Sequence, residues 1–502
     1  MKEKIFLFTA AFVSGMSIMA IEITSARMLA PYFGASAFVW TNIIAVVLIS
    51  LSLGYWFGGK VADKKASFSL AGKLLGLSGV VCLFLPFLFN LFGLFFINSV
   101  AGILPAAFFI FIGSLAVSAL LLGLPLVLLG MISPLLVKLY AASDTSGVGQ
   151  AAGGIFAVST IGSILGTFMP TLIFIPWWGS RMTILLFAVL LIITGVLLSK
   201  RKNNRGLVVL SVILFIANLF IIIEPNNTIY ATESFYQFIR VEEQTDGTRK
   251  LVFNEGLGIQ SVYNPNKILT GYYYDYLNVL PALADRKMKR VLVVGLAGGT
   301  ISRQLLYFYP FLQIDGVEID KKVIETGKKF FSLSDQPVNI YNQDGRIFLQ
   351  LNKGKKLYDF IIIDSYSQEL YIPWIMTTVE FWRLVKANLS PDGVVAFNVA
   401  ALPQNDLTQA LAGTLRSVFP FVYLVSLPDQ QYNVLLVASP QKIEWQFSLP
   451  DSKREKLEVL ARSFASSVEP VVVSDIILTD DWAPVEYLTN RIIWQEVKKM
   501  FN

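Results

Sequence analysis

Long apolar stretches separated by short polar segments make up the first half of the chain. Seven of them approach or exceed the roughly 20 residues that a helix needs to cross a hydrocarbon layer of about 30 Å. They lie near residues 5–24, 38–58, 74–97, 104–129, 152–175, 181–199 and 207–223. The pattern predicts a multi-pass α-helical membrane domain of about seven helices over residues 1–225.

A different pattern begins after residue 225. Residues 238–244 and 249–254 read as strands that flank Asp246-Gly247, a strong hairpin signal, and residues 259–263 read as a third strand. We predict a small antiparallel β unit over residues 226–284.

An α/β pattern follows this unit. Residues 289–294 form a continuous apolar run typical of a buried parallel strand, residues 302–309 an amphipathic helix, and residues 314–320 a second strand. Strands that alternate with helices build a parallel sheet with helices on its faces. We therefore predict a Rossmann-like domain over residues 285–502.

Composition excludes several kinds of site. The 502 residues include no histidine, which excludes Ser-His-Asp and Cys-His nucleophiles and imidazole metal sites. Cys82 is the only cysteine, so neither an intrachain disulfide nor a cysteine zinc site can form. Residues 1–223 hold 13 Lys and Arg against 4 Asp and Glu, in short segments between apolar stretches, whereas the rest hold 28 against 31. This distribution is typical of a membrane protein, so we expect a lipid bilayer as partner and no nucleic acid. From the missing histidine and the single cysteine we also expect no metal.

Chemistry-bearing residues follow four successive predicted strands. A turn with Gly295 and Gly298 follows the first strand, and the next three end near Glu318, Asp344 and Asp364. The carboxyl ends of parallel strands meet at one edge of a sheet, where open α/β sheets bind ligands. Glu318 follows the turn by about 20 residues, the spacing of an acid that binds ribose hydroxyls. Each acid alone could equally be a helix cap or a solvated turn, but together they favour a nucleoside ligand.

The glycine turn favours one kind of nucleoside. Dinucleotide phosphates are usually bound by G-x-G-x-x-G, but Ala297 occupies the second glycine position and no Lys or Arg lies in the turn. An adenosyl sulfonium donor is therefore favoured over NAD.

These motifs resemble those of the membrane-fused members of the spermidine synthase (polyamine aminopropyltransferase) family. In the first half the resemblance rests on Glu22-Ile-Thr-Ser-Ala-Arg27, Ala30-Pro-Tyr-Phe-Gly34, Gly54-Tyr-Trp-Phe-Gly-Gly59 and Ser159-Thr-Ile-Gly-Ser-Ile-Leu-Gly166. In the second half it rests on the strand-end series and on Leu478–Tyr487. It implies a Rossmann-like domain of the S-adenosylmethionine methyltransferase type. The implied activity is aminopropyl transfer from decarboxylated S-adenosylmethionine to an amine such as putrescine, and a homodimer is among the expected assemblies.

The resemblance also implies residues that bind the donor. Gln260, Glu318 and Asp344 with Gly345 would contact decarboxylated S-adenosylmethionine, Glu318 through the ribose and Asp344 near the adenine. The turn of Gly295 and Gly298 would lie against the same ligand.

On the acceptor side, Asp364 would take the proton that the amine loses when it attacks the methylene beside the sulfonium. Tyr273 matches the tyrosine of the family's Tyr-His-Glu segment and would hold the amine's chain. Asp275 takes the place of the glutamate of that segment, and Tyr274 that of its histidine.

Two carboxylates of the family's amine site are missing. The aspartate of its glycine turn falls on Gly298, and the second aspartate of its Asp-Ser-Ser-Asp segment falls on Ser367. A diamine carries two charges that need anionic partners when desolvated. Either other acids replace these carboxylates, or the acceptor is not putrescine. The candidate replacements are Glu369, Asp480, Asp481 and Glu486.

Three functions fit these residues. The first is the aminopropyl transfer described above. The second is methyl transfer from S-adenosylmethionine itself, because the same sheet edge accepts either donor. The third is a non-catalytic membrane protein that senses or transports a nucleoside, with Glu22 and Arg27 in the apolar half.

Two observations disagree about the side of the membrane on which residues 226–502 lie. Of the Lys and Arg residues in the first half, 11 fall on the side of the N-terminus and only Arg27 and Arg181 on the other. With seven full crossings this distribution places residues 226–502 outside the cytoplasm. Adenosyl donors are made in the cytoplasm, however. Since the last apolar segment is short, we expect it to be merged or re-entrant and residues 226–502 to face the cytoplasm.

Overall fold

The computed structural model describes residues 2–34, 37–100, 106–143, 147–199, 205–220, 227–254, 258–366, 371–427, 433–450, 454–489 and 491. Contacts divide the chain into a helical unit, Met1–Asn226 with Thr232–Phe238, and an α/β unit, Asn227–Ala231 with Ile239–Asn502. The three-part division with boundaries at 225 and 284 stays a prediction.

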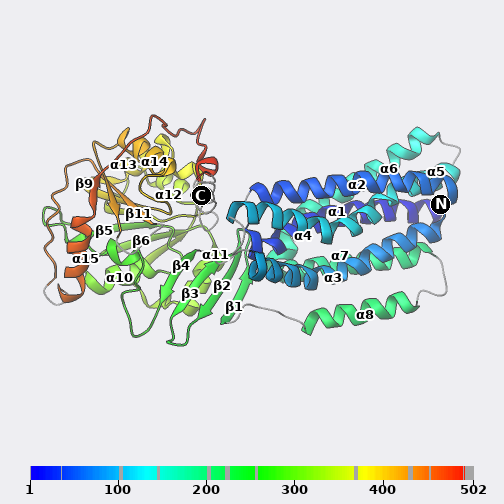
Figure 1. Ribbon diagram of the computed structural model, residues 1–502, viewed down its shortest axis with the longest axis horizontal. Coiled ribbons are helices and arrows are strands. Elements are labelled where there is room, and N and C mark those ends of the chain that lie inside the picture. The colour runs from blue at the N-terminus through cyan, green and yellow to red at the C-terminus, as the bar shows by residue number, and fades with distance from the viewer. Residues whose placement is uncertain are drawn as a thin grey trace. The chain divides into compact units, whose positions relative to one another are not determined.

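The helical unit is a bundle of long apolar helices (Figure 1). They are α1 (Lys2–Phe33), α2 (Ala37–Lys65), α3 (Phe68–Val100), α4 (Ala106–Gly130), α5 (Ile132–Ser143), α6 (Val148–Met169), a π-helical turn (Pro170–Phe174), α7 (Ile175–Ser199) and α8 (Arg205–Phe220). Glycines let α1 and α6 approach closely, because a Cβ at Gly162 would overlap the carbonyl oxygen of Phe12 and one at Gly166 that of Met16. The glycine-rich stretch therefore serves helix packing.

Among the described residues, five helical stretches are long and apolar enough to cross a membrane, fewer than the seven predicted. They are Glu3–Phe33, Phe38–Lys65, Phe68–Gly93, Phe111–Ala142 and Val148–Ser199. The last has 52 residues and would be about 78 Å long as one straight helix, more than twice the hydrocarbon thickness. Gly179, with φ 80° and ψ 166°, breaks the helix. This stretch therefore contains both the fifth and the sixth predicted segments.

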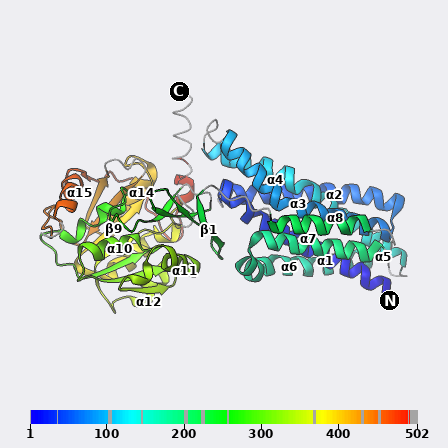
Figure 2. The ribbon, with the colours of Figure 1, turned by 90° about the horizontal axis from the view of Figure 1, so that it is seen from below.

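Helix α8 corresponds to the seventh predicted segment, of which only Val208–Asn218 counts as a short apolar helix. Near its end, Asn218 donates from Nδ2 to the carbonyl of Leu83 in α3 at 2.8 Å, and its own carbonyl accepts from Arg181 at the start of α7. Helices α7 and α8 are therefore antiparallel, and α8 runs lengthwise along the bundle (Figures 1 and 2). Between Arg205 and Phe220 α8 is a single helix that ends beside the start of α7, and the expected merged or re-entrant course of this segment in a bilayer stays a prediction.

The segment Thr232–Phe238 belongs to the helical unit and shows where the chain leaves it. The Glu233 carboxylate accepts from the backbone N–H of Ser180 at 2.9 Å and from its hydroxyl at 2.5 Å. Arg27, near the end of α1, donates to the carbonyls of Ser234 and Phe235. Burial raises the pKa of Glu233, and the Ser180 hydrogen bonds and Arg27 oppose that rise. The chain therefore leaves the bundle at the end that carries Arg27.

Lys4 and Lys138 lie at the other end of the bundle. Lys4, at the start of α1, lies over the ring of Tyr140, and the neighbouring Lys138 pairs with Asp63 at 3.0 Å. Because α1 has 32 residues, about 48 Å of helix separates its two ends.

A four-stranded antiparallel sheet opens the second half. Its strands, in spatial order, are β1 (Thr228–Glu233), β2 (Phe238–Glu243), β3 (Arg249–Phe253) and β4 (Ile259–Tyr263). The hairpin around Asp246-Gly247 and the third predicted strand are confirmed, and β1 is an additional strand.

An eight-stranded sheet forms the core of the α/β unit. Its strands are β5 (Arg290–Val294), β6 (Gln313–Glu318), β7 (Val338–Asn342), β8 (Tyr358–Ile363), β9 (Leu389–Val399), β10 (Phe421–Ser426), β11 (Val434–Ser439) and β12 (Val468–Pro470). The spatial order is β12-β10-β11-β9-β8-β5-β6-β7, with β5 to β9 parallel and the other three pairings antiparallel. The strand order reverses at β5, between β6 and β8, so ligands are expected at the carboxyl ends of these strands.

Helices cover both faces of this sheet, and Figure 1 shows α12, α13 and α14 on one face and α10 and α15 on the other. The helices are α9 (Tyr274–Leu277), α10 (Thr300–Phe308), α11 (Lys321–Phe330), α12 (Gly345–Asn352), α13 (Val379–Ala387), α14 (Asp406–Arg416) and α15 (Arg454–Ser466). Helix α11 packs its Val323 against Ile239 and Leu251 of the four-stranded sheet. The predicted Rossmann-like domain is therefore confirmed.

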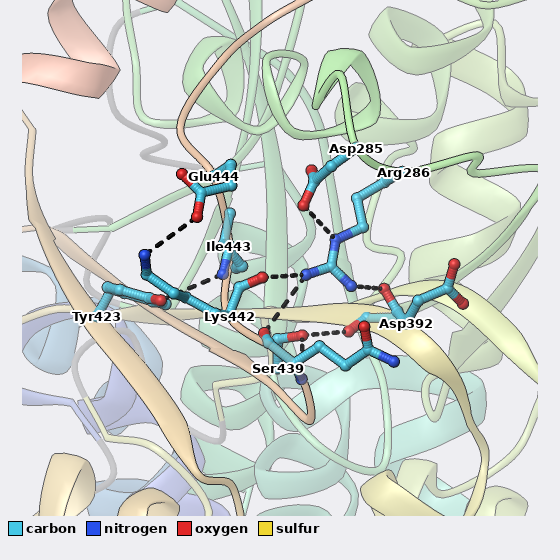
Figure 3. A network of polar contacts seen from close by, with 10 residues as sticks. Asp285, Arg286, Asp392, Tyr423, Ser439, Lys442, Ile443 and Glu444 are labelled. Carbon is cyan, nitrogen blue, oxygen red and sulfur yellow. Dashed lines mark hydrogen bonds and ion pairs between the residues drawn. The ribbon is translucent and has the colours of Figure 1, made fainter.

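A buried arginine fixes the chain where it enters the sheet. Arg286, 7% exposed, pairs with Asp285 and donates to the carbonyls of Asp392 and Lys442, from the start of β9 and the segment after β11 (Figure 3). Ser439 links the same segments by donating to the Gly393 carbonyl at 3.0 Å. This network lies at the amino ends of β5 and β9, so it supports the sheet from the edge opposite the predicted ligand.

Candidate active site

The turn after β5 is built for close approach of backbone. Gly295 has φ +91°, and a Cβ there would overlap the carbonyl oxygen of Asp364. Ala297 adopts φ +48°, a conformation uncommon for residues other than glycine. The N–H of Gly298 donates to the Ser261 hydroxyl of β4 at 2.8 Å. The turn thus brings the ends of β5 and β8 and the small sheet together.

Glu318 ends β6 beneath this turn. Its side chain is 9% exposed, Oε2 accepts from the N–H of Ala297 at 3.0 Å, and Oε1 accepts from the N–H of Asp320 at 3.0 Å. Burial raises the pKa of Glu318 to about 7, although the two backbone hydrogen bonds favour the ionised form. The main chain on both sides therefore fixes this carboxylate.

Asp364 follows β8 and is half-buried. Oδ2 accepts from the Tyr273 hydroxyl at 2.6 Å, and Oδ1 accepts from Nδ2 of Asn398 at 2.9 Å. Desolvation raises the pKa of Asp364 to about 6, and the two hydrogen bonds oppose the rise. The carboxylate is therefore mostly ionised at neutral pH and able to accept a proton.

The predicted acceptor residues Tyr273 and Asp275 have different surroundings. Tyr273 contacts Asp364 directly, and burial together with that carboxylate raises its pKa well above the usual value. Asp275 is buried and accepts from Thr270, from the N–H of Gly271 at 2.7 Å and from Gln304 at 2.6 Å. Both of its oxygens hold the turn before α9, so its contacts are those of a residue that positions Tyr273.

The predicted adenine side lies at the start of α12. Asp344 caps this helix, accepting from the N–H of Ile347 at 2.9 Å, and a Cβ at Gly345 would overlap Val294 of β5. The next residue, Arg346, makes two hydrogen bonds to Asp480, at 2.8 and 2.5 Å. Asp480 also accepts from the hydroxyl of Thr378, the residue that caps α13, at 2.7 Å. Asp480 thus joins the starts of two helices.

The remaining predicted site residues are Gln260, Asp481 and Glu369, and the structure describes the first two. Gln260 is the extra residue of a β-bulge, because Leu251 pairs with Ser261 but Val252 pairs with Ile259. Bulges often re-aim a side chain beside a site. Asp481 is exposed, and Glu369, like Ser367, lies outside the described residues.

Three residues at Asp364 were missed at the sequence level. Asn398 is 2% exposed within the apolar strand β9, Asn433 donates to its Oδ1 at 3.0 Å, and Tyr366 donates to its carbonyl at 3.0 Å. A lone polar residue between Val394 and Val399 was the available signal, because a buried amide in an apolar strand needs partners.

The described residues contain no group of three or more histidine, cysteine, aspartate or glutamate side chains able to hold a metal ion. The polar groups described above are two carboxylates, a phenol and two amides. They belong to Glu318, Asp364, Tyr273, Asn398 and Asn433. Such a set can bind hydroxyls and accept a proton.

Comparison with known proteins gives the family. Residues 271–442 match the spermine/spermidine synthase domain. The chain is 33% identical over 323 residues to a probable polyamine aminopropyl transferase of Bifidobacterium longum, covering 59% of this chain and 71% of the relative. It is 23% identical over 401 residues to polyamine aminopropyltransferase 2 of Aquifex aeolicus, covering 76% of each. A probable spermidine synthase structure from Corynebacterium glutamicum aligns with TM-score 0.39 and 18% identity, over 52% of this chain and 93% of that one.

The second of these matches is longer than the α/β unit and therefore includes part of the helical unit. The matched domain includes Tyr273, the glycine turn, Glu318 and Asp364. On the identity and coverage of the Bifidobacterium relative, the chain belongs to the spermine/spermidine synthase family of polyamine aminopropyltransferases and is a transferase.

Proposed function

We propose that the protein transfers an aminopropyl group from decarboxylated S-adenosylmethionine to an amine, with Asp364 as the proton acceptor. The observation that carries the proposal is the pair of hydrogen bonds that hold Asp364 between Tyr273 and Asn398 at the carboxyl end of β8. A half-buried carboxylate held on both oxygens, beside the strand-order reversal, is well placed to take a proton from a bound nucleophile.

The donor would bind along the ends of β5, β6 and β7. Glu318, oriented by two backbone N–H groups, would accept from the ribose hydroxyls, and Asp344 with Gly345 would lie near the adenine. The glycine turn and Gln260 at its bulge would border the same ligand. No metal is needed, because the positive charge on sulfur already activates the carbon–sulfur bond and methylthioadenosine leaves as a neutral thioether.

The chemical step balances with the residues present. The nitrogen lone pair of the acceptor forms a bond to the aminopropyl carbon beside sulfur, and the carbon–sulfur bond breaks with its electron pair moving to sulfur. Methylthioadenosine leaves, and the proton lost by the amine passes to the Asp364 carboxylate. Tyr273 and Asn398 hold that carboxylate during the transfer.

The acceptor remains the open part of the proposal. Asp480, one candidate for the missing amine anchors, and Asp275, which takes the place of the family's glutamate, already accept several hydrogen bonds within the protein. The remaining candidates from the predicted set are Glu369, Asp481 and Glu486. A diamine such as putrescine is the substrate we propose to test first, with monoamines beside it.

We also propose that the helical unit anchors the enzyme in the membrane with residues 226–502 in the cytoplasm, where adenosyl donors are made. Because α8 runs antiparallel to α7, this placement requires the N-terminus to lie outside, against the Lys and Arg distribution. Fusing a reporter that works only outside the cytoplasm to each terminus tests it. We expect a signal from the N-terminal fusion alone, and a signal from the C-terminal fusion would overturn the placement.

The activity itself is tested with purified protein. Decarboxylated and ordinary S-adenosylmethionine are each incubated with a panel of amines, and mass spectrometry follows the nucleoside product. Methylthioadenosine formed only from the decarboxylated donor, in step with an amine, supports aminopropyl transfer. S-adenosylhomocysteine would indicate a methyltransferase, and binding without turnover would indicate a sensor.

A further inference from the structure

Two asparagines form a chain of hydrogen bonds that ends on Asp364. Asn433 donates from Nδ2 to Oδ1 of Asn398 at 3.0 Å, and Asn398 donates from Nδ2 to Oδ1 of Asp364 at 2.9 Å. Asn398 is buried in β9, and Asn433 directly precedes β11, whose Leu435 pairs with Asn398. The antiparallel pairing of β9 with β11 therefore brings the two amides together.

The direction of this chain is fixed from both of its ends, because the ionised Asp364 carboxylate can only accept and Asn433 donates to Asn398. An amide presents a donor on one side and an acceptor on the other, and the network decides which way it points. Because Asn433 donates to Oδ1 of Asn398, the NH₂ group of Asn398 must face the carboxylate. The reverse orientation would place an amide oxygen against a carboxylate oxygen and leave the Asn433 donor unpaired.

The backbone of Asn398 is held from a second direction. The Tyr366 hydroxyl donates to the Asn398 carbonyl at 3.0 Å and accepts from the N–H of Ala400 at 2.9 Å. Tyr366 lies two residues after Asp364, so the chain that leaves β8 is tied to β9 at the position of the amide. Neither the position nor the orientation of Asn398 is free.

We propose that Asn398, oriented by Asn433, is a positioning residue that keeps the Asp364 carboxylate ionised and aligned for proton transfer. The proposal rests on the proposed function for its role in turnover, but the effect on the carboxylate exists without any substrate. A donor to the charged form favours ionisation, and loss of that donor raises the pKa of the acid.

Three titratable groups face Asp364 from the elements packed around it, namely Tyr273, Tyr274 and Tyr366. The pKa of each phenol is raised by burial and by the nearby carboxylate, so all three are neutral below pH 10. No cation of the described residues contributes to the Asp364 pKa. Its ionisation therefore depends on neutral donors, of which Asn398 supplies the one on Oδ1.

The test compares Asn398→Asp, Asn433→Leu and a matched control. Asn398→Asp replaces the donor by a second carboxylate, and Asn433→Leu removes the group that orients the amide. The control is Asn339→Asp, because Asn339 makes the same 2.9 Å amide contact to another carboxylate, Asp315, on β6. Folding of each full-length variant is checked by its melting temperature.

Two readouts separate the inference from the proposed function. The first is the acid limb of the pH profile of turnover. The second is the infrared band of the protonated Asp364 carboxyl group, identified as the band that Asp364→Asn removes and followed by pH titration without substrate. Wild-type protein without turnover would refute the proposed function, whereas the infrared titration would still report on Asn398.

We expect Asn398→Asp to move the infrared midpoint and the acid limb upward by about one pH unit or more, because two carboxylates in contact cannot both ionise easily. Asn433→Leu should move both in the same direction by less, and Asn339→Asp should move neither. Unchanged midpoints in Asn398→Asp and Asn433→Leu would overturn the inference. A changed melting temperature with an unmoved midpoint would assign Asn398 to stability alone.

Discussion

Two carboxylates at the same sheet edge, the buried Glu318 and the half-buried Asp364, are held in different ways. Glu318 accepts from backbone N–H groups, among them those of Ala297 and Asp320. Asp364 accepts from side chains, the hydroxyl of Tyr273 and the amide of Asn398. The position of the Glu318 carboxylate is fixed by the backbone of two turns. That of the Asp364 carboxylate is fixed by side chains, each of which can be substituted individually.

This difference fits the two different tasks that we propose for the two carboxylates. An anchor for a ribose must keep one geometry, which backbone donors provide because substitution does not remove them. A proton acceptor needs a pKa near the working pH, and side-chain donors adjust that value without changing the fold. Burial raises the pKa of Glu318 to about 7 and that of Asp364 to about 6. Three predictions test the contrast, and a fourth concerns a neighbouring carboxylate.

The largest effect is expected from Asp364→Asn. The amide cannot accept the proton, so turnover should fall by a factor of about 100 or more while donor affinity stays nearly unchanged. Steady-state kinetics and calorimetric donor titration measure the two quantities. Asp359→Asn on the same strand is the control, since Asp359 binds the N–H groups of Lys289 and Arg290 away from the site. Turnover within a few-fold of wild type would remove Asp364 from the mechanism.

Glu318→Gln should act on binding instead. The variant loses a charge-assisted bond to a ribose hydroxyl and can oppose only one of the two N–H groups with an oxygen. Donor affinity should fall by about 1.5–3 kcal/mol, roughly 10- to 150-fold. Glu325→Gln, on the exposed face of α11, is the matched control. Equal affinities for wild type and Glu318→Gln would refute an adenosyl site at this strand end.

The pH dependence should separate the two carboxylates. Both raised pKa values mean that each acid becomes protonated as the pH falls through its value. Turnover at saturating donor should therefore decrease below pH of about 6, and donor affinity should already decrease below about 7. Glu318→Gln should abolish the second dependence and keep the first. A single shared midpoint would mean that the two groups titrate together and do not have separate tasks.

The smallest effect is expected at Asp480, a carboxylate outside this contrast. Its pair with Arg346 is partly exposed, so Asp480→Asn should cost about 1 kcal/mol or less and lower the melting temperature by about 2–4 °C. Arg346 lowers the pKa of Asp480, so this contribution is present above the unfolded value and disappears as the pH falls below about 4. Asp481→Asn, at an exposed position, should leave stability unchanged. A loss of amine affinity in Asp480→Asn would show instead that this segment anchors the substrate.

Local patterns predicted much of the α/β unit. The apolar runs of β5 and β8 and the glycine turn after β5 identify buried parallel strands, and the acids that follow them lie at the sheet edge. Strand β1 was missed because the connection between β1 and β2, residues 234–237, contains no Gly, Pro, Asn or Asp that would signal a turn. The seven apolar segments were counted individually, whereas the structure joins two of them into the 52-residue stretch broken at Gly179.

The details of the site depended on pairings that sequence patterns do not contain. Asn398 and Asn433 are 35 residues apart and meet only through the register of β9 with β11. Whether Asp275 and Asp480 face a substrate or other protein groups depends on side-chain directions, and both engage protein groups. Residues at strand ends could therefore be predicted, and their partners could not.

In the proposed reaction an amine attacks the aminopropyl carbon of the donor and not its methyl carbon. The most direct test uses decarboxylated S-adenosylmethionine with an isotope-labelled methyl group, incubated with the full-length protein and an amine. Mass spectrometry then locates the label. The account predicts that all of the label stays in methylthioadenosine and that the amine gains an unlabelled aminopropyl group. Label on the amine, with an unlabelled nucleoside product, would contradict it.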